Sequence, residues 1–331
     1  MLTLIFSFLV LLQSSTFCAA FQSLSVIPFH LQRQSLLQRQ LSISSYSLAG
    51  SDPDRPSKVN QDAFFHQELD NGSIAFGVLD GHGLQGHILT RFLSLAFPSI
   101  LNNCMATDYQ PTIQLQEYQQ QLINIGKDTN TANYPHFLCQ AFHLGHFSAM
   151  QHPKVPAGRS GTTCLVGVLK GTHLEMCHVG DSRAILMTMT IMDNHVITPL
   201  TIENNVKQMP LELERIQQGE GRIDAMGNIF YGPQGIAMTR SLGNAVMLRA
   251  GILPTPIISN PIQLAKGATI VLATDGVWDV LSNEEVRDIV MKTDNFDTAG
   301  RVLAEAAQQK WIGDLPMEGK VDDITCVIVQ I

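Results

Sequence analysis

The chain has 331 residues, of which 45% are hydrophobic and 15% are charged, so it is expected to fold as a globular protein with a sizeable core. This length allows one or two domains. The net charge of −8 and the lack of a basic run in the sequence argue against a nucleic-acid partner.

Residues 1–51 have the composition of a targeting leader. Residues 2–12 form an apolar run that suits a signal peptide but is short for a transmembrane span, and small residues before Phe21 favour cleavage there. Residues 21–51 contain no acidic residue and many Ser and Leu, which is typical of a transit peptide. A signal peptide at 1–20 followed by this transit-like segment, expected to be disordered, resembles the bipartite leaders of algae with complex plastids. The pattern predicts plastid import; plain secretion is the alternative, followed by a retained membrane anchor.

The predicted folded domain covers residues 52–331 and begins in a Pro- and Asp-rich linker. Apolar runs bounded by Gly, Pro and Asp predict strands at 59–65, 74–79, 162–169, 172–179, 183–190, 269–273 and 324–331. Apolar residues at helical spacing predict helices at about 84–100, 115–125, 137–150, 211–218, 283–291 and 298–311. Ser282 and Glu285 form a capping-box signature at the start of one helix. The polar segment 201–232 resembles a flap, and residues 235–242 are expected to begin a helix or a tight turn.

Two groups of side chains have the residue types of metal ligands but not the pattern. The six cysteines include no C-x-x-C pair, and Cys164, Cys177 and Cys326 lie in predicted strands, where they are expected to be buried. His143 and His146 are three residues apart on the predicted helix 137–150. No acidic residue accompanies them, so we interpret them as solvent-facing helix residues rather than as a metal pair.

Several aspartates border the apolar strands. Asp80 follows IAFGVL, Asp275 follows TIVLAT, Asp322 and Asp323 precede ITCVIVQI, Asp62 lies on the predicted strand 59–65, and Asp181 and Asp279 are near strand ends. Carboxylates without His or Cys suit a hard cation such as Mg²⁺ or Mn²⁺. Each aspartate taken alone also fits a turn or cap residue, and Asp80-Gly81 is a common hairpin turn.

Seven segments in a fixed order resemble the metal-dependent protein serine/threonine phosphatases of the type 2C or PPM class. They are NQDAFF (60–65), FGVLDGHG (76–83), SGTTCLVGVL (160–169), HVGDSRAIL (178–186), GIAMTRSLGN (235–244), LATDGVWDVLSNEEV (272–286) and DDITCVIV (322–329). The resemblance covers about residues 51–331. It implies an α+β fold, a four-layer α-β-β-α sandwich of two antiparallel β-sheets flanked by helices.

The resemblance also implies a role for each site residue. Asp80 would bridge two Mn²⁺ or Mg²⁺ ions, the Gly81 carbonyl would bind one of them, Asp275 and Asp322 would complete the first site, and Asp62 would hold the second. Asp181 and Asp279 match positions that hold a weaker third ion, and His82 matches the proposed general acid. The implied reaction is hydrolysis of phosphoserine or phosphothreonine in a phosphoprotein by a hydroxide that bridges the two ions.

The chain departs from the family pattern near the substrate. Gln61 replaces a frequent Glu, Ser57 stands where many members have a phosphate-binding Arg, and Asn244 replaces the usual Asp. Arg55 and Lys58 are the nearby cations that could bind phosphate. These departures motivate an alternative, a catalytically weak pseudophosphatase that acts as a regulatory binding module. We expect a monomer without a membrane span in the mature chain.

Overall fold

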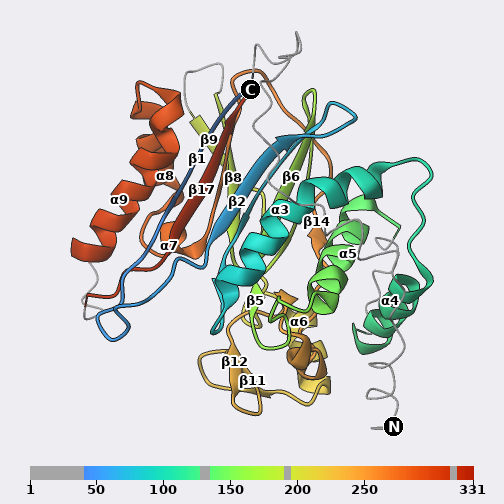
Figure 1. Cartoon of the computed structure of the whole chain (residues 1–331). Coiled ribbons are helices and arrows are strands. Elements are labelled where there is room, and N and C mark those ends of the chain that lie inside the picture. Colours follow the sequence, from blue (N-terminus) through green and yellow to red (C-terminus); the bar gives the residue numbers. More distant parts are fainter. Residues whose placement is uncertain (1–40, 127–134, 190–194, 314–318) are drawn as a thin grey trace. The chain divides into compact units, whose positions relative to one another are not determined.

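Two antiparallel sheets form the centre of the fold (Figure 1). The computed structural model describes residues 41–126, 135–189, 195–313 and 319–331, which belong to one unit that begins at Leu41. The first sheet has the order β1-β17-β16-β8-β9. Its strands are β1 (Ser42–Leu48), β17 (Ile324–Gln330), β16 (Thr269–Ala273), β8 (Arg183–Met189) and β9 (His195–Pro199).

The second sheet has the order β14-β7-β6-β3-β2, and a short strand β15 also pairs with β7. Its strands are β14 (Ile257–Ile258), β15 (Ile262–Gln263), β7 (His173–Val179), β6 (Cys164–Lys170), β3 (Ile74–Leu79) and β2 (Ala63–Glu68). Strands β6 and β7 form the hairpin predicted from Lys170-Gly171, with Lys170 opposite His173. Gly171 has a φ of +62°, a backbone conformation that favours glycine in a tight turn.

Helices cover the outer face of each sheet (Figure 1). The second sheet is covered by α3 (Gly86–Met105) and α5 (Phe137–Gln151), and α4 (Ile113–Gly126) packs on α5. The first sheet is covered by α7 (Asp275–Trp278), α8 (Asn283–Lys292) and α9 (Ala299–Gly313). The predicted capping box is present, with Ser282 and Glu285 bonding each other's backbone amides at the start of α8. The predicted four-layer sandwich is thus confirmed.

Three apolar cores separate the layers. One lies between the second sheet and α3 and α5, one between the first sheet and α7 to α9, and one between the two sheets. Cys164, Cys177 and Cys326 lie in these cores and are buried, as predicted. Within the described part of the chain, no helix is both long and apolar enough to cross a membrane.

The segment predicted as a flap, 201–232, is part of a small unit that continues to Ile252 and has an apolar core of its own. It contains α6 (Pro210–Gln218), the three-stranded sheet of β10 (Arg222–Ile223), β11 (Ile229–Tyr231) and β12 (Gln234–Ile236), and the 3₁₀ helix η3 (Ala245–Ala250). A second small sheet joins β13 (Leu242–Gly243), β5 (Gly161–Thr162) and β4 (Gly81–His82). This second sheet carries the loop after Asp80 next to the end of the flap.

Three expectations about elements were wrong. The transit-like segment 21–51 was expected to be disordered, with folding from residue 52, but residues 42–48 form β1, which pairs with β17 along its whole length. The predicted strand 59–65 starts later, at Ala63, so Asp62 precedes β2 instead of lying on it. Residues 235–242 begin no helix, because they leave β12 and lead into β13. The leader residues 1–40 lie outside the described residues.

The prediction that His143 and His146 face solvent was also wrong, because both side chains are 0% exposed. Helix α5 has neighbours on several sides, and each ring finds a polar partner there. His143 Nε2 lies 3.0 Å from Thr255 Oγ1, and His146 Nδ1 accepts a hydrogen bond of 3.1 Å from the Gly243 amide. Burial lowers the pKa of both rings to about 3, so they are neutral.

Candidate active site

The first sheet brings Asp275 and Asp322 to one edge of the sandwich. Strands β16 and β17 are antiparallel, with Ala273 opposite Cys326. Asp275 follows β16 and is the first residue of α7, and Asp322 precedes β17. The end of one strand and the start of its antiparallel neighbour share an edge, so the two carboxylates are held near each other by stiff elements.

The second sheet brings Asp62 and Asp80 to its own edge in the same way. Ala63, the first residue of β2, pairs with Leu79, the last residue of β3. Asp62 therefore comes just before one strand and Asp80 just after its neighbour. The Asp80 amide donates to Thr163 Oγ1 at 2.9 Å, which ties the end of β3 to the neighbouring strand β6.

The charges of these groups show that the two edges face each other. Burial raises the pKa of Asp80 well above its usual range, and the negative charges of Asp275 and Asp62 raise it further. Burial likewise raises the pKa of Asp275, with added repulsion from Asp181 and Asp322. The negative charges of carboxylates from one sheet thus raise the pKa values of carboxylates from the other, so the two edges lie close together.

The pKa of Asp62 is also raised, but hydrogen bonds from neighbouring threonines oppose the rise. Burial raises its pKa to about 7, although hydrogen bonds from Thr274 and Thr325 oppose the rise. The Thr274 hydroxyl donates to Asp62 Oδ2 at 2.9 Å. Without a cation nearby, burial therefore favours the protonated form of this carboxyl group.

Asp181 and Asp279 complete the cluster on the side of the first sheet. Asp181 lies in the turn between β7 and β8, and burial raises its pKa to about 6, with repulsion from Glu203 and Asp279. Burial also raises the pKa of Asp279, followed by the charges of Asp322 and Glu203. Glu203 belongs to this acidic group and was missed in the sequence, because it stands in the polar flap segment without an adjoining apolar strand.

This donor set fits hard divalent cations. Buried carboxylates that repel one another are costly unless a cation compensates them, and oxygen ligands suit Mg²⁺ and Mn²⁺. The buried Asp181 Oδ1 has no hydrogen-bond partner in the described part of the chain, as expected for a ligand atom. Among the described residues, however, no three His, Cys, Asp or Glu groups are placed so that one ion could bind all three as the side chains stand.

Gly81 lies where a side chain cannot fit. A Cβ at this position would lie 2.5 Å from the Gln61 carbonyl oxygen and 2.8 Å from Thr90 Cγ2. The backbone of the loop after Asp80 thus packs directly on the segment that carries Gln61 and Asp62. The loop and the Asp62 segment are held together in this way.

His82 is half-buried beside Asn244. Its Nε2 lies in hydrogen-bond contact with Asn244 Nδ2, and its Nδ1 is buried with no partner among the described residues. Burial lowers the pKa of His82 to about 4, so the ring is neutral at pH 7. A neutral ring can still donate a hydrogen bond through one nitrogen.

The two predicted phosphate-binding cations each have a carboxylate partner. Arg55 Nε donates to Asp52 at 2.9 Å, and the Arg55 side chain is 73% exposed. Lys58 Nζ lies 2.6 Å from Asp323 Oδ1 and 3.7 Å from Asp322 Oδ1, so it adjoins the carboxylate cluster. A phosphate role for either cation stays a prediction.

Asp323 is a site residue whose role the sequence did not indicate. It is 5% exposed, and its carboxylate accepts hydrogen bonds from the Gly50 amide at 2.7 Å and the Gln61 amide at 2.9 Å. It therefore fixes the segment that leads to Asp62. The only signal in the sequence was the pair Asp322-Asp323 before β17. The side chains of consecutive residues point in different directions, so the two aspartates were bound to have different surroundings.

Comparison with known proteins agrees with this geometry. A family model described as "Protein phosphatase 2C" matches residues 105–312. The chain is 31% identical over 291 residues to "Probable protein phosphatase 2C 1" of Arabidopsis thaliana, covering 82% of this chain and 62% of that relative. It is also 31% identical over 266 residues to "Probable protein phosphatase 2C 72" of the same plant, covering 77% and 76%. The chain belongs to the protein phosphatase 2C family.

Solved structures support the protein phosphatase 2C fold. A "serine-threonine phosphatase 2C from Toxoplasma gondii" aligns with a TM-score of 0.67 at 18% identity, covering 88% of this chain and 95% of that one. A serine/threonine phosphatase of S. agalactiae aligns with a TM-score of 0.55 at 19% identity, covering 88% and 99%. The chain spans about 62% of the length of the first Arabidopsis relative.

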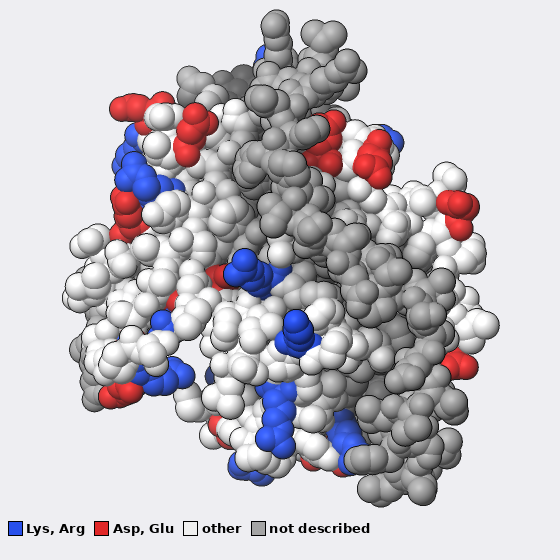
Figure 2. All heavy atoms as spheres, in the orientation of Figure 1, with Lys and Arg blue, Asp and Glu red and all other residues white. Residues whose placement is uncertain are grey.

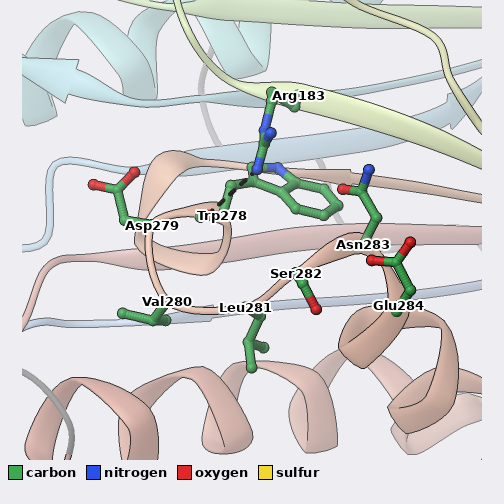
Figure 3. A pocket seen from close by; sticks show the side chains of 8 residues that line it. All are labelled: Arg183, Trp278, Asp279, Val280, Leu281, Ser282, Asn283 and Glu284. Carbon is green, nitrogen blue, oxygen red and sulfur yellow. Dashed lines mark hydrogen bonds between the residues drawn. The ribbon is translucent and has the colours of Figure 1, made fainter.

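A pocket of about 370 Å³ opens beside the carboxylate cluster of this protein phosphatase 2C domain (Figure 3). The Arg183 guanidinium lies over the Trp278 ring, 4.9 Å from its centroid, and donates to the Trp278 carbonyl at 3.3 Å. Asp279 lies at one side of this pair, and Asn283 and Glu284 lie at the other. The pocket is lined in part by polar side chains and adjoins the carboxylate cluster through Asp279.

The face of the described residues that Figure 2 shows has mixed charge. On the face of the described residues in Figure 2, basic and acidic side chains form small groups among uncharged surface. The expectation of no nucleic-acid partner stays a prediction.

Proposed function

We propose that the chain is a metal-dependent phosphoprotein phosphatase that hydrolyses phosphoserine or phosphothreonine. The observation that carries this proposal is the gathering of six carboxylates from both sheets at one edge, of which Asp62, Asp80, Asp181 and Asp275 are half-buried and Asp279 and Asp322 are exposed. Burial, together with the negative charges nearby, raises the pKa of Asp62, Asp80, Asp181, Asp275 and Asp279, which favours a bound cation over free carboxylates. The membership in the protein phosphatase 2C family supports the same reaction class.

Asp80, Asp275, Asp322 and Asp62 would hold two Mn²⁺ or Mg²⁺ ions, with the Gly81 carbonyl as a further ligand. Asp181 and Asp279 would hold a weaker third ion. Such ions supply a water of lowered pKa and offset the charge of the phosphate. The carboxylates would hold the ions, and His82 would supply a hydrogen bond to the leaving Ser or Thr oxygen.

Hydrolysis of p-nitrophenyl phosphate and of a phosphothreonine peptide tests this proposal. We expect activity with Mn²⁺, loss of activity with EDTA, and a loss of at least about 100-fold in Asp275→Asn. Asp108→Asn is the matched control, since Asp108 is exposed and lies on the connection after α3. Wild-type activity no higher than that of Asp275→Asn would favour the alternative of a regulatory binding module.

For localisation, we propose plastid import through a bipartite leader, with the secretory pathway as the alternative. The composition of residues 1–40 supports this proposal, and residues 42–48, which form β1, are left out of the leader to be tested. A fluorescent reporter fused behind residues 1–40 should enter the plastid of an alga with complex plastids. Cytosolic fluorescence would contradict both destinations. We further propose a monomer that acts on phosphoproteins; sedimentation of the purified chain checks the first part.

A further inference from the structure

We propose that Asn244 and Gln234 are positioning residues that orient His82, set its tautomer and connect it with the flap. The inference deepens the proposed function and rests on it for the role of His82 in the reaction. It is carried by a chain of hydrogen bonds from strand β12 through Asn244 to the imidazole. Each link restricts the direction of the next one.

The chain of hydrogen bonds begins at Gln234, the first residue of β12 in the flap sheet. Its Nε2 donates to the Arg159 carbonyl at 2.9 Å and to Asn244 Oδ1 at 3.0 Å. The Arg159 carbonyl can only accept, so the amide nitrogen of Gln234, and not its oxygen, must face it and the neighbouring Asn244 atom. Gln234 thereby fixes which atom of the Asn244 side chain is the oxygen.

Asn244, oriented in this way, in turn orients the His82 ring. With Oδ1 toward Gln234, its Nδ2 faces the His82 ring and also donates to Ser241 Oγ at 3.2 Å. The Asn244 side chain cannot turn easily, because the residue is only 1% exposed. Its backbone N–H also donates to the Ser160 carbonyl at 2.9 Å, which holds the main chain in place. Its φ of 49° lies in the left-handed region, which Asn tolerates better than most residues.

His82 must then accept at Nε2. An amide N–H group cannot accept, so the Nε2 atom that meets it carries no proton in the neutral ring, and the proton is on Nδ1. The space is tight: a Cβ on Gly161 would lie 2.4 Å from His82 Nε2 and 2.1 Å from Asn244 Nδ2. The ring is therefore confined between β5 and Asn244.

Nδ1 is the nitrogen that remains for the substrate. It is buried and has no hydrogen-bond partner among the residues that the structure describes, which is costly unless a ligand supplies one. A leaving Ser or Thr oxygen is an acceptor of the required kind. The structure thus assigns His82 Nδ1–H as the donor to that oxygen, while Asn244 and Gln234 hold the ring and do not touch the substrate.

The connection also makes His82 depend on the flap. Gln234 belongs to the same small sheet as β10 and β11, so a shift of the flap moves the donor that orients Asn244. A carboxylate at position 244 would accept from His82 instead of donating to it. The amide therefore selects the opposite tautomer from the one that an Asp would select.

The spectroscopic test uses long-range ¹H–¹⁵N correlation on the full chain with ¹⁵N-labelled histidine and Mg²⁺, with His82→Gln for assignment. We expect His82 to carry its proton on Nδ1 in the wild type and to move toward the Nε2–H tautomer in Asn244→Gly. Glycine at 244 keeps the left-handed backbone without strain. A proton on Nε2 in the wild type, or no change in Asn244→Gly, would overturn the proposal.

The kinetic test compares a phosphothreonine peptide with p-nitrophenyl phosphate, whose leaving group hardly needs a hydrogen-bond donor. Asn244→Gly should lower kcat on the peptide by about 10- to 100-fold with KM little changed, and on the aryl phosphate by clearly less. Gln234→Ala should show the same pattern at about 3- to 10-fold. Gln116→Ala is the control, because Gln116 Nε2 likewise donates to a carbonyl, that of Pro111, on exposed surface.

The outcomes separate this inference from the proposed function. Equal losses on both substrates, or a change in KM alone, would contradict a positioning role in variants that melt like the wild type. A wild-type chain without Mn²⁺-dependent activity would instead contradict the proposed function. The tautomer measurement still decides the positioning of His82 in that case.

Discussion

One buried carboxylate, Glu212, holds two buried arginines in the flap. Its oxygens accept from Arg215 Nη1 at 2.8 Å and from Arg240 Nη2 at 2.6 Å, and the three side chains are only 3%, 8% and 9% exposed. The arginines also donate to the carbonyls of Gly251 and Thr255. These contacts join α6 to the loop before β13.

We expect Glu212→Gln to destabilise the protein by about 3 kcal/mol at pH 7. Burial alone would raise the pKa of Glu212, but the charge of Arg240 and the bonds and charge of Arg215 outweigh it and lower the pKa from 4.5 to about 2. At 1.36 kcal/mol per pKa unit this corresponds to about 3 kcal/mol. Removing one partner of a buried ion pair costs about 3–5 kcal/mol, which agrees.

Urea unfolding at pH 7 measures this loss, and Glu214→Gln is the control. Glu214 lies on the same helix, is exposed and accepts from Gln218 Nε2 at 3.1 Å, so its replacement should change the free energy of unfolding by less than about 0.5 kcal/mol. Amide hydrogen exchange would show whether α6 opens alone. In that case exchange rises in the flap while β17 stays protected.

The pH dependence gives a second check on Glu212. Because its folded pKa is lowered, its stabilisation is present above the unfolded pKa of about 4.5 and is lost as the pH falls toward 2. The difference between wild type and Glu212→Gln should therefore shrink below pH 4. A loss under 1 kcal/mol at pH 7, or a difference that is constant down to pH 2.5, would refute the role assigned to this triad.

Three further predictions concern the termini and the carboxylate cluster. A chain that begins at residue 50 lacks β1 and should melt roughly 5 °C or more below a chain that begins at residue 41, as measured by calorimetry; equal melting temperatures would contradict the role of β1. Saturating Mn²⁺ should stabilise the wild type by about 3 kcal/mol at 100 times the dissociation constant, but not Asp80→Asn, in thermal-shift assays. In metal-free protein, the raised pKa of Asp62 favours folding below pH 3.8 and this contribution is lost as the pH rises through about 7. Stability in EDTA should accordingly fall over that range, and Mn²⁺ should remove the fall; a flat profile in EDTA would contradict the burial of this carboxylate.

The main strands and helices were predictable because apolar periodicity and turn residues agree along most of the domain. The aspartates could also be placed, since each adjoins a long apolar run whose direction in an antiparallel sheet is fixed. Residues 42–48 were missed because SISSYSL has few large apolar residues and the composition of a transit segment. Its place in the sheet depends on pairing with β17, more than 270 residues away.

The burial of His143 and His146 could not be predicted for a related reason. Their partners, Thr255 and the Gly243 amide, come from distant parts of the chain. A histidine at helical spacing gives no sign of which polar group will meet it in the folded state. Only the surrounding packing decides whether such a ring is buried and neutral or exposed.

The structure gives the side-chain amides of Gln61 and Asn244 another interpretation than the sequence did. In the sequence, Gln61 and Asn244 stand where the family pattern has carboxylates. These two differences motivated the alternative of a weak pseudophosphatase. In the structure, each amide uses its N–H group, which a carboxylate does not have: Gln61 Nε2 donates to the Gly83 carbonyl at 3.0 Å, and Asn244 Nδ2 faces His82. Both donors thus fix the short loop that follows Asp80. The two amides therefore have structural roles on this loop, and the comparison of wild type with Asp275→Asn decides between the proposed phosphatase and the regulatory module.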